Sequence, residues 1–158
     1  MDSLFKIVSS GDLEKLKENL NEININKLNI TSVSLLQQAL KDKQEKIALY
    51  LIEKGINVNN KDDAGFNSLH YIAVYENDLA IAKLCLANGA DVNIKDNYGN
   101  NALWTAIFYA RGNYAYVEFL LQNKADLNSV NKSGKTPLDL AYLFKFQGLI
   151  DLVSSFNN

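Results

Sequence analysis

The sequence of 158 residues is poor in the residue types that carry most enzyme chemistry, with one cysteine, one histidine, one proline and one tryptophan. The single cysteine, Cys85, excludes a disulfide within the chain, and the single histidine excludes His and Cys sets at metal-ligand spacing. The H-E-x-x-H, G-x-S-x-G and phosphate-loop motifs are also absent. We therefore expect no catalytic site, no metal and no cofactor, except for weak ion binding at Asp62 and Asp63 as an alternative.

Charge and hydropathy give no sign of a nucleic acid or membrane partner. The 16 basic and 18 acidic residues leave a formal charge of −2, and both signs are interspersed along the chain. No apolar run approaches the roughly 20 residues of a membrane span. Residues 1–10 lack the basic region and long apolar run of a secretory signal. We expect a cytoplasmic protein that binds neither nucleic acid nor membrane.

What the chain does contain is an internal repeat. Residues 52–70, IEKGINVNNKDDAGFNSLH, return at 86–104 as LANGADVNIKDNYGNNALW. Gly65 and Gly99 are 34 residues apart, and Gly99 and Gly134 are 35 apart, so one residue has been inserted before the later copy. A fainter copy precedes these. A period near 34 predicts a stacked array of small units.

Each unit reads as a pair of short antiparallel helices followed by a turn. In residues 67–88, two helical patterns flank a polar break at 76–78. Asn67 stands where an N-cap is needed, Gly89 where a left-handed residue ends a helix, and Gly99 in a tight turn. The equivalent positions are Asn101 and Thr136 for the cap, Gly55 and Lys124 for the helix end, and Gly65 and Gly134 for the turn.

These units resemble the ankyrin repeat. TPLDLA at 136–141, SLH at 68–70 and NGADVN at 88–93 carry the likeness, which covers essentially the whole chain. The resemblance implies an all-α solenoid of five stacked helix-turn-helix units with connecting β-turn loops. The expected units are an N-terminal cap at 1–27, internal repeats at 28–60, 61–94 and 95–129, and a C-terminal cap at 130–158.

His70 and Cys85 are both expected to be structural. His70 falls at the histidine of the family's T-P-L-H pattern, where the resemblance implies a bond between neighbouring turns. Cys85 lies on the apolar face of its helix, which predicts a buried, inert thiol. The expected counterparts are Leu36, Trp104 and Asp139 for His70, and Leu51 and Leu120 for Cys85.

The resemblance places a partner on a concave face made by the turn tips and the first helix of each unit. Aromatic residues that face outward there would form an apolar patch of the kind that marks an interface. The expected outward helix positions are Leu40, Lys41, Val74, Tyr75, Phe108, Tyr109, Leu143 and Phe144. The expected outward turn positions are Asp63, Ala64, Phe66, Asn97, Tyr98, Asn100, Lys132, Ser133 and Lys135. The predicted partner-binding residues are Asp63, Phe66, Val74, Tyr75, Asn97, Tyr98, Asn100, Phe108 and Tyr109.

The insertions between helices leave alternatives for several aromatic residues, because they can rotate a helix and turn Phe108 into the core. We expect Phe144 to pack in the core or the cap, and Trp104 to be core rather than contact. Tyr75 and Tyr109 are expected to be partly exposed.

The function expected from the resemblance is non-catalytic binding of one protein partner by a chain that is monomeric when free. The chain starts with Met and has no linkers, so we expect binding to be its whole activity. The Asn, Ile and Lys bias favours a bacterial source, and small ankyrin proteins of this kind resemble immunity proteins that neutralise a toxin. The alternatives are a general adaptor or effector scaffold, a self-associating structural subunit and, less favoured, a small enzyme.

Overall fold

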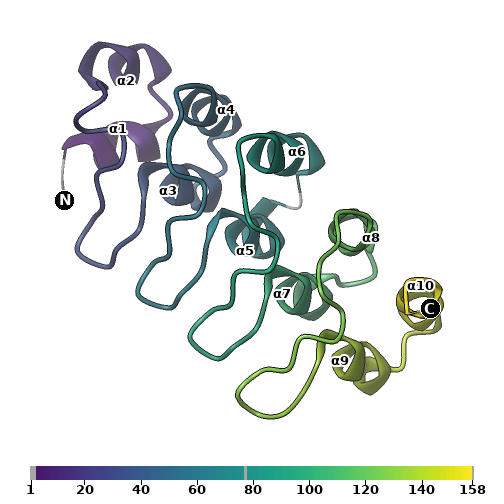
Figure 1. The fold of residues 1–158 in the computed structure, drawn as a ribbon. Coiled ribbons are helices and arrows are strands. Elements are labelled where there is room, and N and C mark those ends of the chain that lie inside the picture. Colours follow the sequence, from purple (N-terminus) through teal and green to yellow (C-terminus); the bar gives the residue numbers. More distant parts are fainter. Residues whose placement is uncertain (1–2, 77, 158) are drawn as a thin grey trace.

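The computed structural model describes residues 3–76 and 78–157 as two stacked rows of helices (Figure 1). Within those residues there is no strand, only two isolated bridges, so the expected all-α solenoid is confirmed. The first row contains α1 (Ser3–Ser10), α3 (Leu35–Lys41), α5 (Ser68–Tyr71) with the π-turn η1 (Ile72–Glu76), α7 (Ala102–Tyr109) and α9 (Pro137–Phe144). The second contains α2 (Leu13–Asn19), α4 (Glu45–Glu53), α6 (Leu79–Ala87), α8 (Ala115–Gln122) and α10 (Gln147–Ser155).

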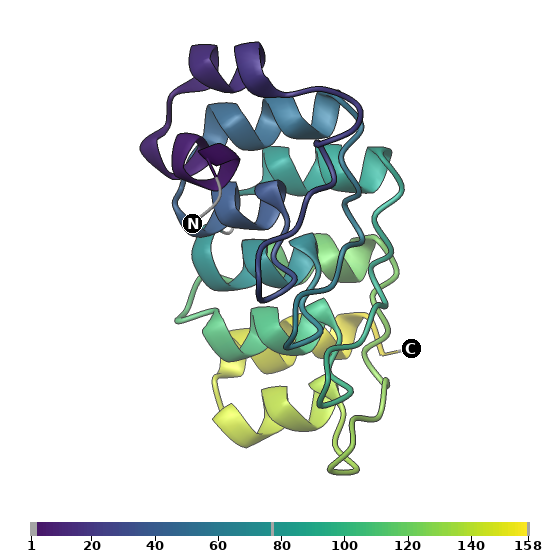
Figure 2. The same cartoon turned by 90° about the vertical axis from the view of Figure 1, so that its left-hand side faces the viewer.

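We call the first row the inner helices and the second row the outer helices. The long loops between units project past the inner helices as fingers, which stack in the same order as the helices (Figures 1 and 2). Each finger closes on one side-chain acceptor. The Oδ1 of Asp62 accepts the N–H groups of Ala64 and Phe66, both at 2.9 Å, and Gly65 between them has a φ of 86°. The equivalent acceptors are Asn29, Asp96 and Asn131, and the equivalent positive-φ residues are Ser32, Gly99 and Gly134.

Hydrogen bonds join each finger to the next. The Asn97 N–H donates to the carbonyl of Ala64 at 3.0 Å, and the Lys132 N–H donates to that of Tyr98 at 2.9 Å. Fingers that share backbone bonds in this way stack at a fixed spacing, so the surface they form is continuous from one unit to the next.

The inner helices begin at the N-caps that the repeat predicted. The side chains of Asn67, Asn101 and Thr136 each accept a backbone N–H three residues on, and Pro137 occupies the first turn of α9. Ser34 caps α3 in the same way, which the faint first copy did not reveal. The left-handed residues expected after the outer helices are also confirmed, with positive φ at Gly55, Gly89 and Lys124.

Inserted residues are absorbed between the inner and outer helices. In the unit of α5, the helix widens into η1, where one extra residue enters the turn. In the unit of α7, the chain instead runs through a link at 110–114 with positive φ at Arg111 and Gly112. Both solutions leave the first turn of the inner helix undisturbed, which keeps the fingers in register.

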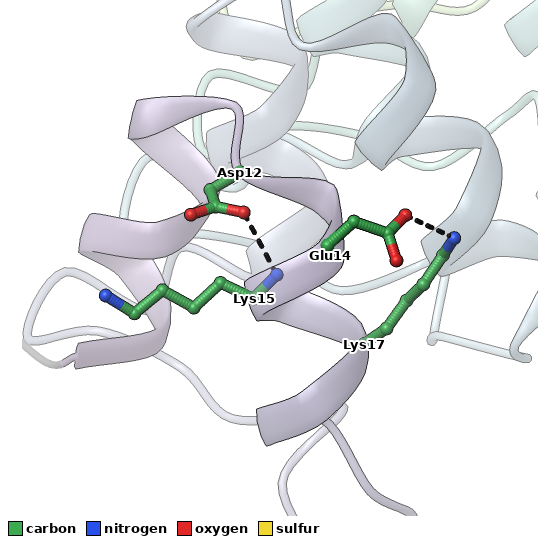
Figure 3. A network of polar contacts seen from close by, with 4 residues as sticks. All are labelled: Asp12, Glu14, Lys15 and Lys17. Atoms are coloured by element: carbon green, nitrogen blue, oxygen red, sulfur yellow. Dashed lines mark hydrogen bonds and ion pairs between the residues drawn. The ribbon is translucent and has the colours of Figure 1, made fainter.

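Local polar contacts cap and flank the second helix, α2 (Figure 3). The carboxylate of Asp12 caps the helix by accepting the Lys15 N–H at 3.0 Å. Glu14 and Lys17 form an exposed pair at 2.8 Å, which is the one ion pair among the described residues. Because exposed pairs add little stability, α2 depends mainly on Leu16, which is fully buried.

The core runs without a break between the two rows of helices. Tyr116 of α8 donates its hydroxyl to the carbonyl of Leu69 at 3.0 Å, which joins neighbouring units through the interior. Cys85 is fully buried, and burial raises the pKa of its thiol to about 12, which agrees with the expectation of an inert side chain. Within the described residues, no helix is long and apolar enough to span a membrane.

Candidate partner-binding face

The fingers and the inner helices together form one surface, which we call the inner face and which corresponds to the expected concave face. Aromatic side chains are exposed across it: Tyr98 by 70%, Phe108 by 55%, Tyr75 by 37% and Tyr109 by 36%. The partial exposure expected of Tyr75 and Tyr109 is therefore confirmed, and Phe108 does not turn into the core. The ring centroids of Phe108 and Tyr109 are 5.1 Å apart, and both rings line one groove with Tyr98, so these three form a patch that water solvates poorly.

A groove of about 370 Å³ lies between the finger at 96–100 and α7. It is lined by predicted partner-binding residues from two units, namely Phe66, Tyr98, Asn100, Phe108 and Tyr109. Of the remaining predictions, Val74 and Tyr75 lie on η1, and Asp63 and Asn97 lie at the finger tips, outside the groove lining. Four of the five aromatic predictions therefore line one groove together with Trp104, and Tyr75 lies outside it.

The three polar predictions hold the fingers together. The Asp63 carboxylate accepts the Ser32 hydroxyl at 2.5 Å, and the Asn97 amide donates to the Asp63 carbonyl at 2.7 Å. The Asn100 amide donates to Asp96 at 3.2 Å and accepts from Asn131 at 2.9 Å. A partner can use only the hydrogen-bonding capacity that these contacts leave free.

One expected outward residue is wrong: Leu40 is buried, with 1% of its surface exposed. The cap of α3 is Ser34, which lies 33 residues before Asn67 rather than 34. Counted from the caps, Leu40 corresponds to Ala73 and Ile107, both core residues. The shift of one residue moves a side chain by about 100° around a helix, enough to take it from solvent to core.

The same shift corrects the counterpart of His70 from Leu36 to Gln37. Gln37 and His70 each lie three positions after the N-cap of their helix, and each side chain reaches a carbonyl of the following finger. Gln37 donates to the carbonyl of Phe66 at 2.6 Å, and the His70 Nε2 lies 3.2 Å from that of Asn100. The bond between neighbouring turns expected of His70 is therefore confirmed. We call the set Gln37, His70, Trp104 and Asp139 the N3 column.

His70 is fully buried, and desolvation lowers the pKa of its imidazole even though both ring nitrogens lie near carbonyl oxygens. Its ring also stacks on Phe66, with the ring centroids 5.0 Å apart. A neutral ring packed between helix and finger is a structural element, and its surroundings offer no access for a substrate.

Phe144 was expected to pack in the core or the cap, and Trp104 to pack in the core rather than to contact a partner. Phe144 packs against the core and lies 6.1 Å from the Phe108 ring and 6.2 Å from the Phe146 ring, as expected of core or cap packing. Trp104 packs against the core but is only partly buried, and it lines the groove. Trp104 is therefore both a packing residue and a contact surface.

A second groove, of about 570 Å³, contains none of the predicted partner-binding residues. It lies between the last finger and α9, and its lining includes Trp104, Lys135, Tyr142 and Leu143. Tyr142 is 47% exposed and Leu143 is 71% exposed. Lys135 and Leu143 were among the expected outward positions, so the sequence did point to part of this groove. Tyr142 was not, because the equivalent positions in the preceding units are buried.

The possible ion site at Asp62 is already occupied by protein donors. Its Oδ1 holds the finger closed, and its Oδ2 accepts the Tyr71 hydroxyl at 2.8 Å. Across residues 3–76 and 78–157, no three His, Cys, Asp or Glu side chains gather as a metal would require. The Asp62 carboxylate is a turn acceptor, and the Asp63 carboxylate accepts the Ser32 hydroxyl of the preceding finger.

Helix pairs that stack in one direction, each with a finger bonded to the next, define a helical repeat protein whose units share a continuous surface. The chain belongs to the ankyrin-repeat family: the model of that family, described as ankyrin repeats in three copies, matches residues 4–96 and 69–155. Membership makes the chain a protein-interaction module.

Curated relatives extend the likeness. The human SMC5-SMC6 complex localization factor protein 1 is 29% identical over 94% of this chain, and its bovine counterpart is 28% identical over the same share. The ankyrin repeat protein FPV034 of fowlpox virus (strain NVSL) is 36% identical over 69% of this chain. The chain spans only 15% of each mammalian relative and 25% of the viral one.

Proposed function

We propose that the chain binds one protein partner through its inner face and performs no catalysis. The observation that carries this proposal is the exposed aromatic patch, in which Tyr98 and Phe108 have more than half of their surface in solvent. Aromatic side chains are effective anchors because they bury a large area at a small cost in rotamer entropy. The proposed contact residues are Asp63, Phe66, Val74, Tyr75, Asn97, Tyr98, Asn100, Phe108 and Tyr109.

The role that the comparisons favour is that of an adaptor. The name of the mammalian relatives describes a localization factor for a protein complex, and a module that holds one partner suits such a task. The relatives are vertebrate and viral proteins, so they lend no support to a bacterial source or to toxin neutralisation. The immunity role and the monomeric, cytoplasmic state stay predictions.

The test is capture of partners from the source cell by the wild-type chain and by a Tyr98→Ala/Phe108→Ala variant. Both side chains are exposed, so the variant should fold normally, as circular dichroism will check. We expect a partner retained by the wild type to lose at least about 2 kcal/mol of binding free energy in the variant.

The matched control is Phe156→Ala, which removes a 39% exposed aromatic ring just beyond α10, away from the inner face. It should bind as the wild type does. If the partner is lost from the control but kept by the inner-face variant, the binding surface lies elsewhere. If purified chain alone forms a dimer that Tyr98→Ala/Phe108→Ala abolishes, the patch serves self-association.

A further inference from the structure

The N3 column changes its role at Trp104. Gln37 and His70 each bridge to a carbonyl of the following finger, and the position that corresponds to their acceptors is the carbonyl of Lys135. In the part of the chain that the structure describes, the Trp104 indole N–H has no hydrogen-bond partner. The last finger is therefore not bridged to α7 as the earlier fingers are to α3 and α5.

Trp104 lines the grooves on both sides of this break. The first groove lies toward Tyr98 and Phe108, and the second lies toward Tyr142 and Leu143. Together they place a continuous set of apolar side chains along the C-terminal half of the inner face. Because Trp104 offers an apolar ring and a free N–H donor, it can take both a side chain and a carbonyl oxygen of a ligand.

Positive charge borders the second groove. Lys135 lines it, and Lys132 lies on the same finger, next to Tyr98 through the backbone bond between the fingers. Neither lysine forms an ion pair within the described residues, where Lys17 and Glu14 make the one pair. The Asp139 carboxylate, also in the lining, has a lowered pKa, chiefly because it accepts the Thr136 N–H at 2.9 Å and to a smaller extent because of the positive charge of Lys135. Since neither lysine is held in an ion pair, both can still meet an external anion.

We propose that this surface binds an extended peptide segment of the partner in which Asp or Glu adjoins an aromatic or long aliphatic residue. The apolar residue packs on Trp104, a backbone carbonyl of the peptide accepts the indole N–H, and the carboxylate meets Lys132 and Lys135. This inference rests on the proposed binding function and adds the chemistry of the ligand. An exposed charged pair selects the ligand's sequence and speeds association, while the apolar contact provides most of the affinity.

The experiment selects 12-residue peptides from a random display library on the immobilised full chain. We expect the selected peptides to be enriched in Asp or Glu beside Leu, Ile, Phe or Trp. Their affinity should fall about tenfold or more in Lys132→Glu/Lys135→Glu. The matched control is Lys46→Glu/Lys83→Glu on the outer helices α4 and α6, which makes the same charge change at exposed positions and should leave affinity unchanged.

Trp104 supplies a second readout because it is the only tryptophan of the chain. Binding of a selected peptide should shift its emission to shorter wavelength as the ring is covered. Without peptide, Lys132→Glu/Lys135→Glu should lower the quenching of Trp104 by iodide and raise its quenching by caesium relative to the wild type, because the wild-type lysines attract the anion and repel the cation. Trp104→Phe, which keeps a ring but has no N–H, should weaken peptide binding severalfold.

The outcomes separate this inference from the proposed function. If peptides require Tyr98 and Phe108 but carry no acidic residues and ignore the lysine variant, the inner face binds protein and the ligand chemistry is wrong. If no selected peptide depends on any inner-face residue, both proposals fail. If the lysine variant instead abolishes a dimer of the chain, the surface binds a second copy and the peptide proposal is overturned.

Discussion

Two halves of the inner face are built on the same helix and finger plan but use it differently. In the N-terminal half, Gln37 and His70 are fully buried and bridge α3 and α5 to the fingers that follow. In the C-terminal half, the same position is Trp104, whose ring is partly exposed between two grooves. One position of the repeat can thus stabilise the stack in one unit and present a surface in the next.

The comparison extends to the helix caps. Gln37, His70 and Asp139 each complete a capping box by accepting the N–H of their own cap residue. Trp104 cannot do so, because its indole nitrogen is a donor only, and α7 has just the Asn101 half of the cap. Losing one cap bond costs about 1 kcal/mol, so a tryptophan at this position is a stability cost that a contact role would explain.

The largest expected effect comes from Gly65→Ala, which should disturb the stacking of one finger on the next. In Gly65→Ala, the new Cβ would meet the backbone nitrogen of Asn97 at 2.7 Å, at a φ of +86°. We expect a loss of about 3 kcal/mol in the free energy of unfolding, the upper end for one strained backbone position. Gly134→Ala occupies the same turn position with nothing within 4 Å, so only the φ penalty of about 1 kcal/mol remains.

Urea denaturation of the two glycine variants measures this difference directly. The wild type and both variants should unfold with the same denaturant slope, so that midpoints can be compared. Equal losses in the two variants would mean that contact between fingers adds nothing to the backbone penalty, and that the two halves are equally open.

An exchange of residues within the N3 column should give the next largest effect. His70→Trp forces a larger ring into a fully buried site and removes the contact to Asn100, so we expect a loss of about 2 kcal/mol from overpacking. Trp104→His removes a partly exposed ring and restores an N–H able to reach the Lys135 carbonyl. Its stability should stay within about 1 kcal/mol of wild type.

Thermal unfolding of both exchange variants tests the asymmetry. The double variant His70→Trp/Trp104→His should lose about the sum of the single changes if the two units respond independently. A destabilisation by Trp104→His as large as that by His70→Trp would show that Trp104 is mainly a core residue and that its exposure has little meaning.

The repeat spacing predicted the fold and most of the local signals because these depend on short-range chemistry. Caps at Asn67 and Asn101 and left-handed residues such as Gly89 follow from rules that act within a few residues. The predicted register of α3 was wrong because its cap, Ser34, lies 33 residues before Asn67 rather than 34. Periodicity predicts which side chains of a helix face solvent only when the cap residue is known. The width of η1 was likewise not encoded in any local pattern.

The candidate site was less predictable because it depends on where one unit lacks a contact that the other units make. Tyr98 and Phe108 could be proposed from their helix and finger positions alone. The exposure of Tyr142 could not, because its column is buried in preceding units, where Ile107 has 1% of its surface exposed. Likewise, the free N–H of Trp104 becomes visible only when the bridge made by His70 is known.

The smallest expected effect is a pH dependence of the free energy of unfolding that comes from His70, in the N-terminal half of the inner face. The folded-state pKa of His70 is lowered by burial below its ordinary value of 6.5. The free energy of unfolding should therefore be at its full value above pH 6.5 and should decline below it, since the unfolded chain then binds a proton that the folded chain resists. The slope from this group cannot exceed about 1.4 kcal/mol per pH unit.

The matched variant is His70→Gln, because Gln37 makes the same bridge from the same position of the previous unit. It should fold and lose the decline between pH 7.5 and 5.5, measured by urea denaturation. Trp104 does not titrate, so acidification of the wild type should lower the protection of backbone amides from exchange at residues 96–100, after division by the intrinsic rate at each pH, and should leave protection at 131–135 unchanged. If the free energy of unfolding of His70→Gln declines with falling pH as steeply as that of the wild type, other groups cause the decline. His70 would then form the bridge without a difference in proton binding between the folded and unfolded states.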